Sequence, residues 1–367
     1  MDALELTKEL VNIPSETVRD GEKNVGRYIK DYIHRLGVEA ELVEFAPNRA
    51  NVIASIGKGE GLMLNGHMDT VPAGDKSQWE FGPNAVEHSG KLYGRGTSDM
   101  KAGIACILAA LSKSNLKNPK RRILLAFVAG EETGFDGSNY LLDHRQSIFQ
   151  GVKYGVIGEP TDLKIQIAQK GVTDTVITFK GKGAHGSKPW LGDNAILKAT
   201  RFIDELMKLS NTFSIEDPIL GKGTINIGKI SGGTAINVVP DSCSIEIDRR
   251  MVPGESKELV LRQYKSVLKK LRINDAVVDM KFGRNAFSLD EKSKIVQMVK
   301  AVSSAKISEG ATGYTEAELY KAKANIDSVV FGPGTKEIIH QPNEYIPIAN
   351  IAKATTVFEK LIKRWIG

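Results

Sequence analysis

Residues 62–72 read LMLNGHMDTVP, an apolar run that leads directly into polar residues. The same pattern recurs at 122–132 (RILLAFVAGEE) and at 155–160 (GVIGEP), and an apolar helical segment, MKAGIACILAALSKS, occupies 100–114. Near-continuous apolar strands that alternate with helices are typical of an α/β domain. The sequence therefore predicts a mixed, mainly parallel sheet with helices on both faces.

The pattern changes near Gly171, where VTDTVITFK (172–180) alternates residue by residue, as a half-exposed antiparallel strand does. A helix, two further strands, a second helix and a last strand follow. This β-α-β-β-α-β order indicates an inserted α+β domain of the ferredoxin-like kind. We expect a catalytic α/β domain formed by residues 1–170 and 284–367, interrupted by an α+β domain formed by residues 171–283.

Length, charge and cysteine usage exclude several classes of protein. A chain of 367 residues suits two domains, and its net charge of +6 is spread along the sequence, which disfavours a nucleic-acid binder. Its two cysteines, Cys106 and Cys243, lie far apart, which excludes a disulfide-stapled domain and favours buried, reduced thiols. Because the sequence has neither a signal peptide nor a run of about 20 apolar residues, we expect a cytoplasmic protein without a membrane partner.

The residues after the first apolar run are candidates for a metal site. His67 and Asp69 lie two apart, so an extended chain points both to the same side, where the acid can hold the imidazole. The alternative is a strand-end histidine paired with a surface acid. Asp99 follows Gly94 and Gly96 at the entry to a helix, where it could also be a helix N-cap.

Three further carboxylates and a second histidine follow the other apolar runs. Glu131 and Glu132 are adjacent, and two carboxylates repel each other unless a cation or a proton lies between them; a solvated acidic loop is the alternative. Glu159 and His340 also follow apolar runs, and sites in open α/β sheets form at that edge. Histidines and carboxylates without cysteine suit zinc, cobalt or manganese, and an aspartate could bridge two cations.

Six motifs occur in one order along essentially the whole chain: GHMDTVP, GRGTSDMKAG, EETG, GEP, GAHGSKPWLGDNAI and HQPNEY. In this the sequence resembles the metal-dependent aminoacylases and peptidases that include acetylornithine deacetylase, succinyl-diaminopimelate desuccinylase and carboxypeptidase G. The resemblance implies hydrolysis of a linear amide bond in a small N-acyl amino acid. It also implies two divalent metal ions, zinc or cobalt with manganese as the alternative, and a homodimer formed through the inserted lid domain.

The resemblance further implies a role for each motif residue. Asp99 would bridge the two ions, with a cis peptide to Met100, and Asp69 would orient a histidine ligand. Glu131 would be the general base that takes a proton from a water shared by the ions and passes it to the leaving amine. The implied metal ligands are His67, Asp99, Glu132, Glu159 and His340.

Three residues of the inserted domain match substrate-binding positions of these enzymes. His185 would stabilise the oxyanion, often from the partner subunit, while Asn237 and Arg250 would hold the substrate carboxylate. An arginine suits that task because its planar guanidinium can donate two hydrogen bonds to one carboxylate. The alternatives are that Asn237 is a turn residue and that Arg250 lies on the wet face of its strand.

The stretch GYTEAELY (313–320) resembles acetylornithine deacetylase more than the desuccinylase, and this resemblance implies N-acetyl-L-ornithine, and hence arginine biosynthesis, as the first candidate substrate and pathway. Its Thr315 and Glu316 either contact a basic substrate side chain or simply begin a helix. The alternatives are an N-succinyl-LL-diaminopimelate desuccinylase of lysine biosynthesis and a dipeptidase or carboxypeptidase on the same scaffold. A non-catalytic metal-binding protein is the most distant alternative.

Overall fold

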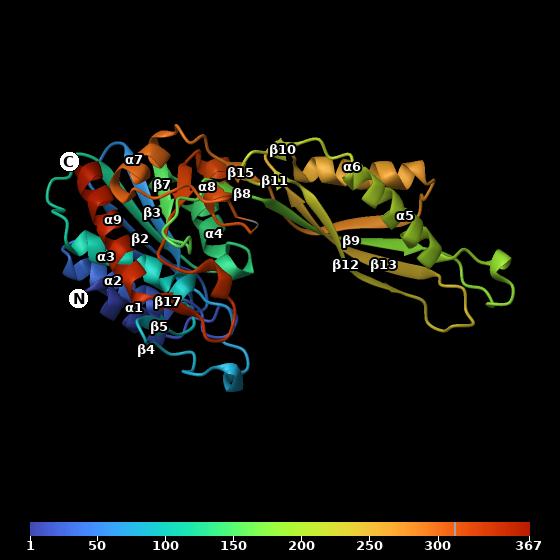
Figure 1. Ribbon diagram of the computed structural model, residues 1–367, viewed down its shortest axis with the longest axis horizontal. Helices are drawn as coiled ribbons and strands as arrows, with labels where there is room; N and C mark the ends of the chain where they lie inside the picture. The colour runs from blue at the N-terminus through green and yellow to red at the C-terminus, as the bar shows by residue number, and fades with distance from the viewer. Residues whose placement is uncertain (312) are drawn as a thin grey trace. The chain divides into compact units, whose positions relative to one another are not determined.

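The computed structural model describes residues 1–311 and 313–367 and divides into two compact units (Figure 1). Unit 1 contains Met1–Ile167, Leu289–Ser308 and Thr315–Gly367. Unit 2 contains Ala168–Ser288 and Glu309–Tyr314. The two units have different sheets and different cores, and each is described by itself.

Unit 1 is built on a six-stranded sheet in the order β1-β2-β6-β3-β7-β16. The strands β6, β3, β7 and β16 are parallel, and β2 and β1 extend the sheet in antiparallel pairing. The strands are β1 (Ala40–Ala46), β2 (Arg49–Ile56), β3 (Gly61–His67), β6 (Arg122–Val128), β7 (Val152–Ile157) and β16 (Asp327–Val330). β3 is buried along its entire length, as expected for a central strand with covered faces.

Helices cover both faces of this sheet, as the sequence predicted. The α-helices of unit 1 are α1 (Ala3–Asn12), α2 (Lys23–Arg35), α3 (Ala102–Ser112), α4 (Asp136–His144), α7 (Lys294–Ser303), α8 (Ala317–Ala324) and α9 (Ile348–Ile366). Successive strand residues point to opposite faces, and β3 shows this at its carboxyl end. Gly66 faces Ile104 of α3, whereas the Asn65 amide donates to the Tyr320 hydroxyl of α8 at 3.0 Å.

A glycine pair brings α3 against the carboxyl end of β7. A Cβ at Gly103 would collide with the carbonyl oxygen of Gly158, so the close approach of this helix to the chain requires a glycine. Glu159 is the next residue along the chain. The packing of α3 therefore helps to fix the position of the backbone at Glu159.

Unit 2 has a four-stranded antiparallel sheet in the order β12-β13-β9-β14. Its elements are β9 (Gly171–Lys180), α5 (Ala195–Ser210), β12 (Thr224–Gly232), β13 (Ser242–Met251), α6 (Lys257–Lys270) and β14 (Ala276–Arg284). Alternate residues such as Ile177 and Ile245 pack against Phe202 of α5 and Tyr264 of α6. The expected β-α-β-β-α-β order is confirmed, and with it the predicted fold class.

Short strands complete the two units. β17 (Tyr345–Pro347), β5 (Lys91–Tyr93) and β4 (Val86–His88) form a small sheet in unit 1. In unit 2, β8 (Ala168–Gln169) pairs with β15 (Phe287–Ser288), and β10 (Glu216–Asp217) pairs with β11 (Gly221–Lys222).

Both cysteine thiols are free and buried. Across the described residues, no helix combines the length and the apolar character that crossing a membrane requires.

Candidate metal centre

Three of the predicted ligands gather at the carboxyl edge of the unit 1 sheet. His67 is the last residue of β3, Glu159 follows β7, and Asp99 lies in an irregular segment before α3. The His67 Nε2 atom lies 2.9 Å from Asp99 Oδ1 and 3.4 Å from Glu159 Oε1. Since His67 is fully buried and the two acids are nearly so, these three groups form one enclosed cluster.

A second cluster shares the same aspartate. The His340 Nε2 atom lies 3.1 Å from Asp99 Oδ2 and 3.1 Å from Glu132 Oε1. Asp99 therefore presents one oxygen to each histidine. The peptide between Asp99 and Met100 is cis, as the resemblance implied.

These donors fit two divalent cations. Zinc binds imidazole nitrogen and carboxylate oxygen at about 2.0–2.2 Å, which places the donors of a tetrahedral site about 3.4 Å apart. The donor separations in both clusters lie close to that value. The set of nitrogen and oxygen donors also suits cobalt and manganese.

Asp69 has a different set of contacts from the one expected. The His67 Nδ1 atom lies 3.0 Å from the Asp69 backbone carbonyl and 3.5 Å from its carboxylate, so the main chain is the nearer partner of the ring. The Asp69 carboxylate accepts the backbone N–H groups of Glu131 at 3.2 Å and of Glu132 at 3.1 Å. It also accepts the hydroxyl of Thr17 at 2.8 Å. Asp69 thus links the first histidine to the turn that carries both glutamates.

Glu131 lies on the side of the cluster that contains Glu159 and Glu316. One oxygen of each of these three carboxylates lies within 4.8 Å of the others. Burial raises the pKa of Glu131 well above its usual range, and the negative charges of Glu159 and Glu316 add to the shift, which the charge of His67 opposes. A carboxyl group in such surroundings can hold a proton near neutral pH, which is what proton transfer in catalysis requires.

Comparison with known proteins identifies the family of this chain. The model of the peptidase family M20/M25/M40 matches residues 63–364. The chain belongs to this family. It is therefore a metal-dependent hydrolase of amide bonds, as the sequence predicted, and the resemblance found in the six motifs is confirmed.

Two curated relatives are named for different substrates. A probable succinyl-diaminopimelate desuccinylase of Staphylococcus aureus is 30% identical over 398 residues, covering 99% of this chain and 98% of the relative. An acetylornithine deacetylase of Aliivibrio fischeri is 30% identical over 360 residues, covering 94% and 92%. The desuccinylase thus matches over more of the chain.

Solved structures of the M20 family share the fold. The aminopeptidase PepT of Bacillus cereus has a TM-score of 0.83 at 24% identity, covering 100% of this chain and 98% of that one. The YXEP protein of Bacillus subtilis, described as a dinuclear metal-binding peptidase, has a TM-score of 0.74 at 17% identity, covering 99% and 97%. Both likenesses extend over the whole M20 architecture.

The acids around His340 favour its protonated form. Hydrogen bonds to Asp99 and Glu132 raise the pKa of His340 to about 10. A histidine must be neutral to bind a metal, so a cation that occupies this position releases a proton. For Asp99, burial would raise the pKa, but hydrogen bonds from His340 and His67 outweigh it and lower the pKa below its usual range.

Glu316 lies inside unit 1 and is fully buried. Its carboxylate accepts the Ser138 hydroxyl at 3.3 Å, and Ser138 in turn lies 3.2 Å from the Tyr320 hydroxyl. Burial raises the pKa of Glu316 to about 7. Glu316 is thus held by a hydroxyl beside the carboxylate cluster that it forms with Glu131 and Glu159. Thr315 accepts the backbone N–H of Ala317 near the start of α8.

The three predicted substrate residues lie in unit 2, at two ends of one strand. His185 is exposed, and a β-bridge to Val238 brings its loop beside Asn237, whose carbonyl accepts the Gly186 N–H at 2.7 Å. Arg250 lies near the other end of β13 and donates two hydrogen bonds to Asp248, at 2.8 and 2.9 Å. Arg250 is eight residues after Ser242, the first residue of β13. At about 3.3 Å per residue in a strand, these two ends of β13 are about 26 Å apart.

Proposed function

We propose that the chain removes the acyl group from an N-acyl diamino acid, with N-succinyl-LL-diaminopimelate as the first candidate substrate. The observation that carries the proposal is the pair of histidine–carboxylate clusters that share Asp99, with Glu131 beside them. The desuccinylase relative covers 99% of the chain. For this reason the succinylated substrate takes the place of N-acetyl-L-ornithine, which the sequence alone favoured.

The proposed cofactor is a pair of divalent cations, zinc or cobalt, with manganese as the alternative. His67, Asp99 and Glu159 would hold the first, and Asp99, Glu132 and His340 the second. When bound, such a pair polarises an amide carbonyl and lowers the pKa of water. The dinuclear character of the Bacillus subtilis neighbour supports a pair of ions rather than a single ion.

In this proposal, Glu131 moves the proton. Its carboxylate would accept a proton from the attacking water and then donate it to the leaving amine. The pKa of Glu131 is raised by burial and by neighbouring acids, which suits a group that must gain and lose a proton near neutral pH. Glu132, by contrast, is close to His340 and is assigned to metal binding.

A homodimer formed through unit 2 is part of the proposal. Because the two ends of β13 are far apart, one chain cannot bring its own Asn237 and Arg250 to the same small substrate through this strand. A dimer removes the difficulty if one chain supplies Arg250 and the partner supplies His185 and Asn237. These donors would then bind the oxyanion and the substrate carboxylate.

N-acetyl-L-ornithine remains the second candidate substrate. The acetylornithine deacetylase of Aliivibrio fischeri is as similar in percentage identity, over 94% of this chain. The stretch GYTEAELY also favours it. Its product, like that of the desuccinylase reaction, is an amino acid with a second amine.

Kinetics on a substrate panel test the proposed function. Chelator-stripped protein is reloaded with zinc, cobalt or manganese and assayed on N-succinyl-LL-diaminopimelate, N-acetyl-L-ornithine, a dipeptide and a tripeptide. We expect the highest kcat/KM for the succinylated substrate. A preference for acetylornithine would support the second candidate. A preference for peptides, or no hydrolysis by protein that has bound both cations, would contradict the proposal.

A further inference from the structure

Glu344 is a buried carboxylate that binds the segment carrying Asp99. Its Oε1 atom accepts three backbone N–H groups, from Gly96 at 3.1 Å, Ser98 at 2.9 Å and Asp99 at 3.1 Å. Its Oε2 atom accepts the Arg95 guanidinium at 2.6 Å. No part of the Glu344 side chain is exposed to solvent.

The segment that Glu344 holds is irregular and needs such a partner. Gly96 has a φ of 86°. Asp99 has a non-helical φ of −120° and lies in the segment that leads into α3. Buried backbone N–H groups that no helix or sheet pairs must find another acceptor. One oxygen of Glu344 supplies that acceptor for three of them, the last being the N–H of Asp99 itself.

Glu344 also belongs to the segment that carries His340, four residues earlier in the chain. Two further bonds join this segment to the Asp99 segment: the Gly94 N–H donates to the Glu344 carbonyl at 2.9 Å, and the Ser98 hydroxyl donates to the Tyr345 carbonyl at 2.7 Å. The two segments therefore lie side by side. The carboxylate of Glu344 is the contact that reaches the backbone of Asp99.

We propose that Glu344 is a positioning residue that holds Asp99 and His340 at the spacing of the second cation. The second cluster has two of its three ligands on the joined segments, Asp99 and His340. In the first cluster, only Asp99 lies on them, because His67 ends β3 and Glu159 follows β7. Loss of the Glu344 carboxylate therefore weakens the second cation site more than the first.

The alternative role for Glu344 is a purely structural one, as the buried partner of Arg95. Three variants separate the two roles. Glu344→Ala removes the acceptor for all three N–H groups, Glu344→Gln keeps a carbonyl oxygen in its place, and Arg95→Met breaks the ion pair while leaving the Glu344 carboxylate intact. The inference rests on the two-cation site of the proposed function but is independent of the substrate.

The experiment is calorimetric titration of chelator-stripped full-length protein with zinc, alongside thermal unfolding of each variant. Residues that orient the metal ligands without touching the metal themselves typically contribute about 10–100-fold to metal affinity. We expect one of the two equivalents of zinc to bind about 10–100-fold more weakly in Glu344→Ala and by a smaller factor in Glu344→Gln. The other equivalent stays within about threefold of the wild type in both variants, and Arg95→Met keeps the affinity of both equivalents.

Two results would overturn the inference. One is wild-type affinity for both equivalents in both Glu344 variants. The other is an equal loss at both sites that Arg95→Met reproduces, which is the behaviour of a purely structural ion pair. If Glu344→Ala does not fold, Glu344→Gln against Arg95→Met gives the same comparison. Wild-type protein that binds no cation would contradict the proposed function instead, so the two failures are distinct.

Discussion

Glu131 and Glu132 are adjacent in the chain but have different neighbours. Asp69 accepts the N–H group of each, which fixes the turn that separates the two side chains. Glu132 then meets His340, whereas Glu131 lies among buried carboxylates. This difference in surroundings supports assigning metal binding to one residue and proton transfer to the other.

Replacing Glu131 tests that assignment. Glu131→Gln keeps the size of the side chain but removes the group that would accept a proton, so we expect kcat to fall by about 10²–10⁴-fold. Both equivalents of metal should remain bound, as measured by elemental analysis of the dialysed protein. Glu9→Gln, which changes an exposed acid of α1, is the matched control and should retain full activity. A Glu131→Gln variant with most of its activity would show that another residue is the base.

Most of the predicted metal ligands could be found from the sequence because they stand where an apolar strand ends or a helix begins, whereas His340 lies in a loop ten residues after β16 and was indicated by the HQPNEY motif. The structure brings His67, Asp99, Glu132, Glu159 and His340 together. Thr17, the carboxylate contacts of Asp69 and the contacts of Glu344 could not be found in this way, because hydrogen bonds from side chains to a distant backbone leave no periodic pattern. Glu344 does stand in the HQPNEY motif, which was the available signal.

At the scale of elements, long periodic segments were predictable and short ones were not. The central strands and the helices α1, α2, α3 and α9 follow directly from runs of apolar residues. Strands β4, β5 and β17 have three residues each, and β17 pairs with β5 across more than half of the chain. Three residues are too few to show the alternation of apolar and polar residues that marks a strand. Pairing between strands so far apart in the sequence depends on the tertiary fold.

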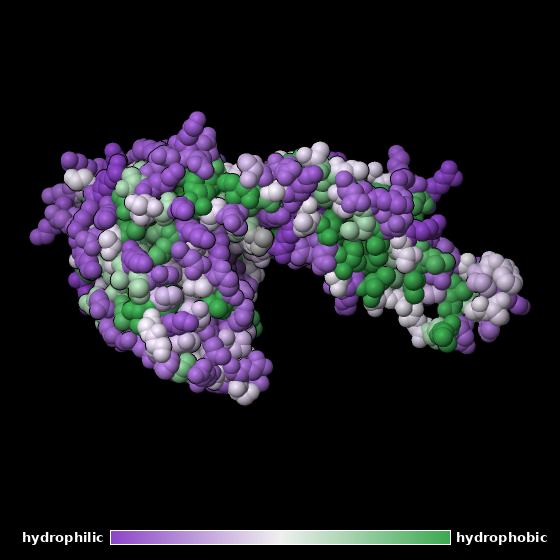
Figure 2. Space-filling view, viewed as in Figure 1, coloured by the Kyte–Doolittle hydropathy of each residue, from purple (hydrophilic) through white to green (hydrophobic). Residues whose placement is uncertain are grey.

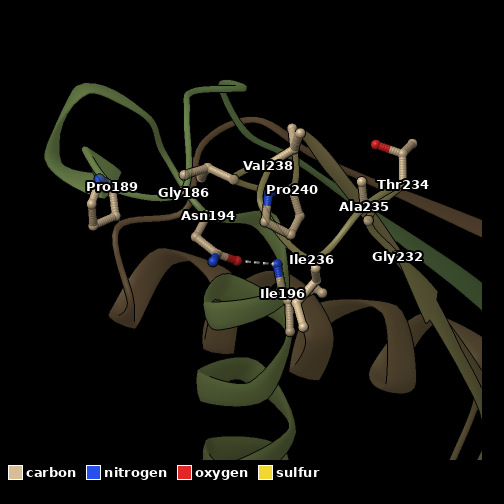
Figure 3. A pocket seen from close by; sticks show the side chains of 12 residues that line it. Gly186, Pro189, Asn194, Ile196, Gly232, Thr234, Ala235, Ile236, Val238 and Pro240 are labelled. Atoms are coloured by element: carbon tan, nitrogen blue, oxygen red, sulfur yellow. Dashed lines mark hydrogen bonds between the residues drawn. The ribbon is translucent and has the colours of Figure 1, made fainter.

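The strand β12 is an edge of the unit 2 sheet, and the chain beside it exposes apolar side chains. Ile236 is fully exposed and Ile230 is half exposed. Figure 2 shows this apolar surface at the end of unit 2 that carries the loop after β12. A hollow of about 540 Å³ lies there, lined by Ile236, Val238, Ile196 of α5 and Asn194, the N-cap of that helix (Figure 3). An edge strand offers unpaired N–H and C=O groups, so this region suits pairing with a second copy of the chain.

We predict that the protein is a dimer in analytical ultracentrifugation and that Ile236→Asp shifts it towards the monomer. A charge at a contact between apolar surfaces costs several kcal/mol when it is buried without a partner. Activity should fall together with dimer content, since Asn237 is the next residue. The control is Val18→Asp, which places the same charge on an exposed valine of unit 1. A monomeric wild type, or an Ile236→Asp variant that dimerises normally, would contradict this prediction.

At the scale of the whole molecule, the change of hydrophobic pattern near Gly171 was sufficient to predict an inserted α+β fold. The sheet order of unit 2 and its antiparallel pairing agree with that prediction. The choice of substrate could not be derived in the same way, because relatives named for two different substrates are each 30% identical to this chain. All five residues of the candidate metal centre belong to unit 1.

The measurement that tests the central claim most directly is anomalous diffraction at the zinc absorption edge, from crystals grown with zinc. We predict two peaks about 3.5–4 Å apart. One should lie among His67, Asp99 and Glu159, and the other among Asp99, Glu132 and His340. A single peak, or peaks that do not share Asp99, would contradict the account.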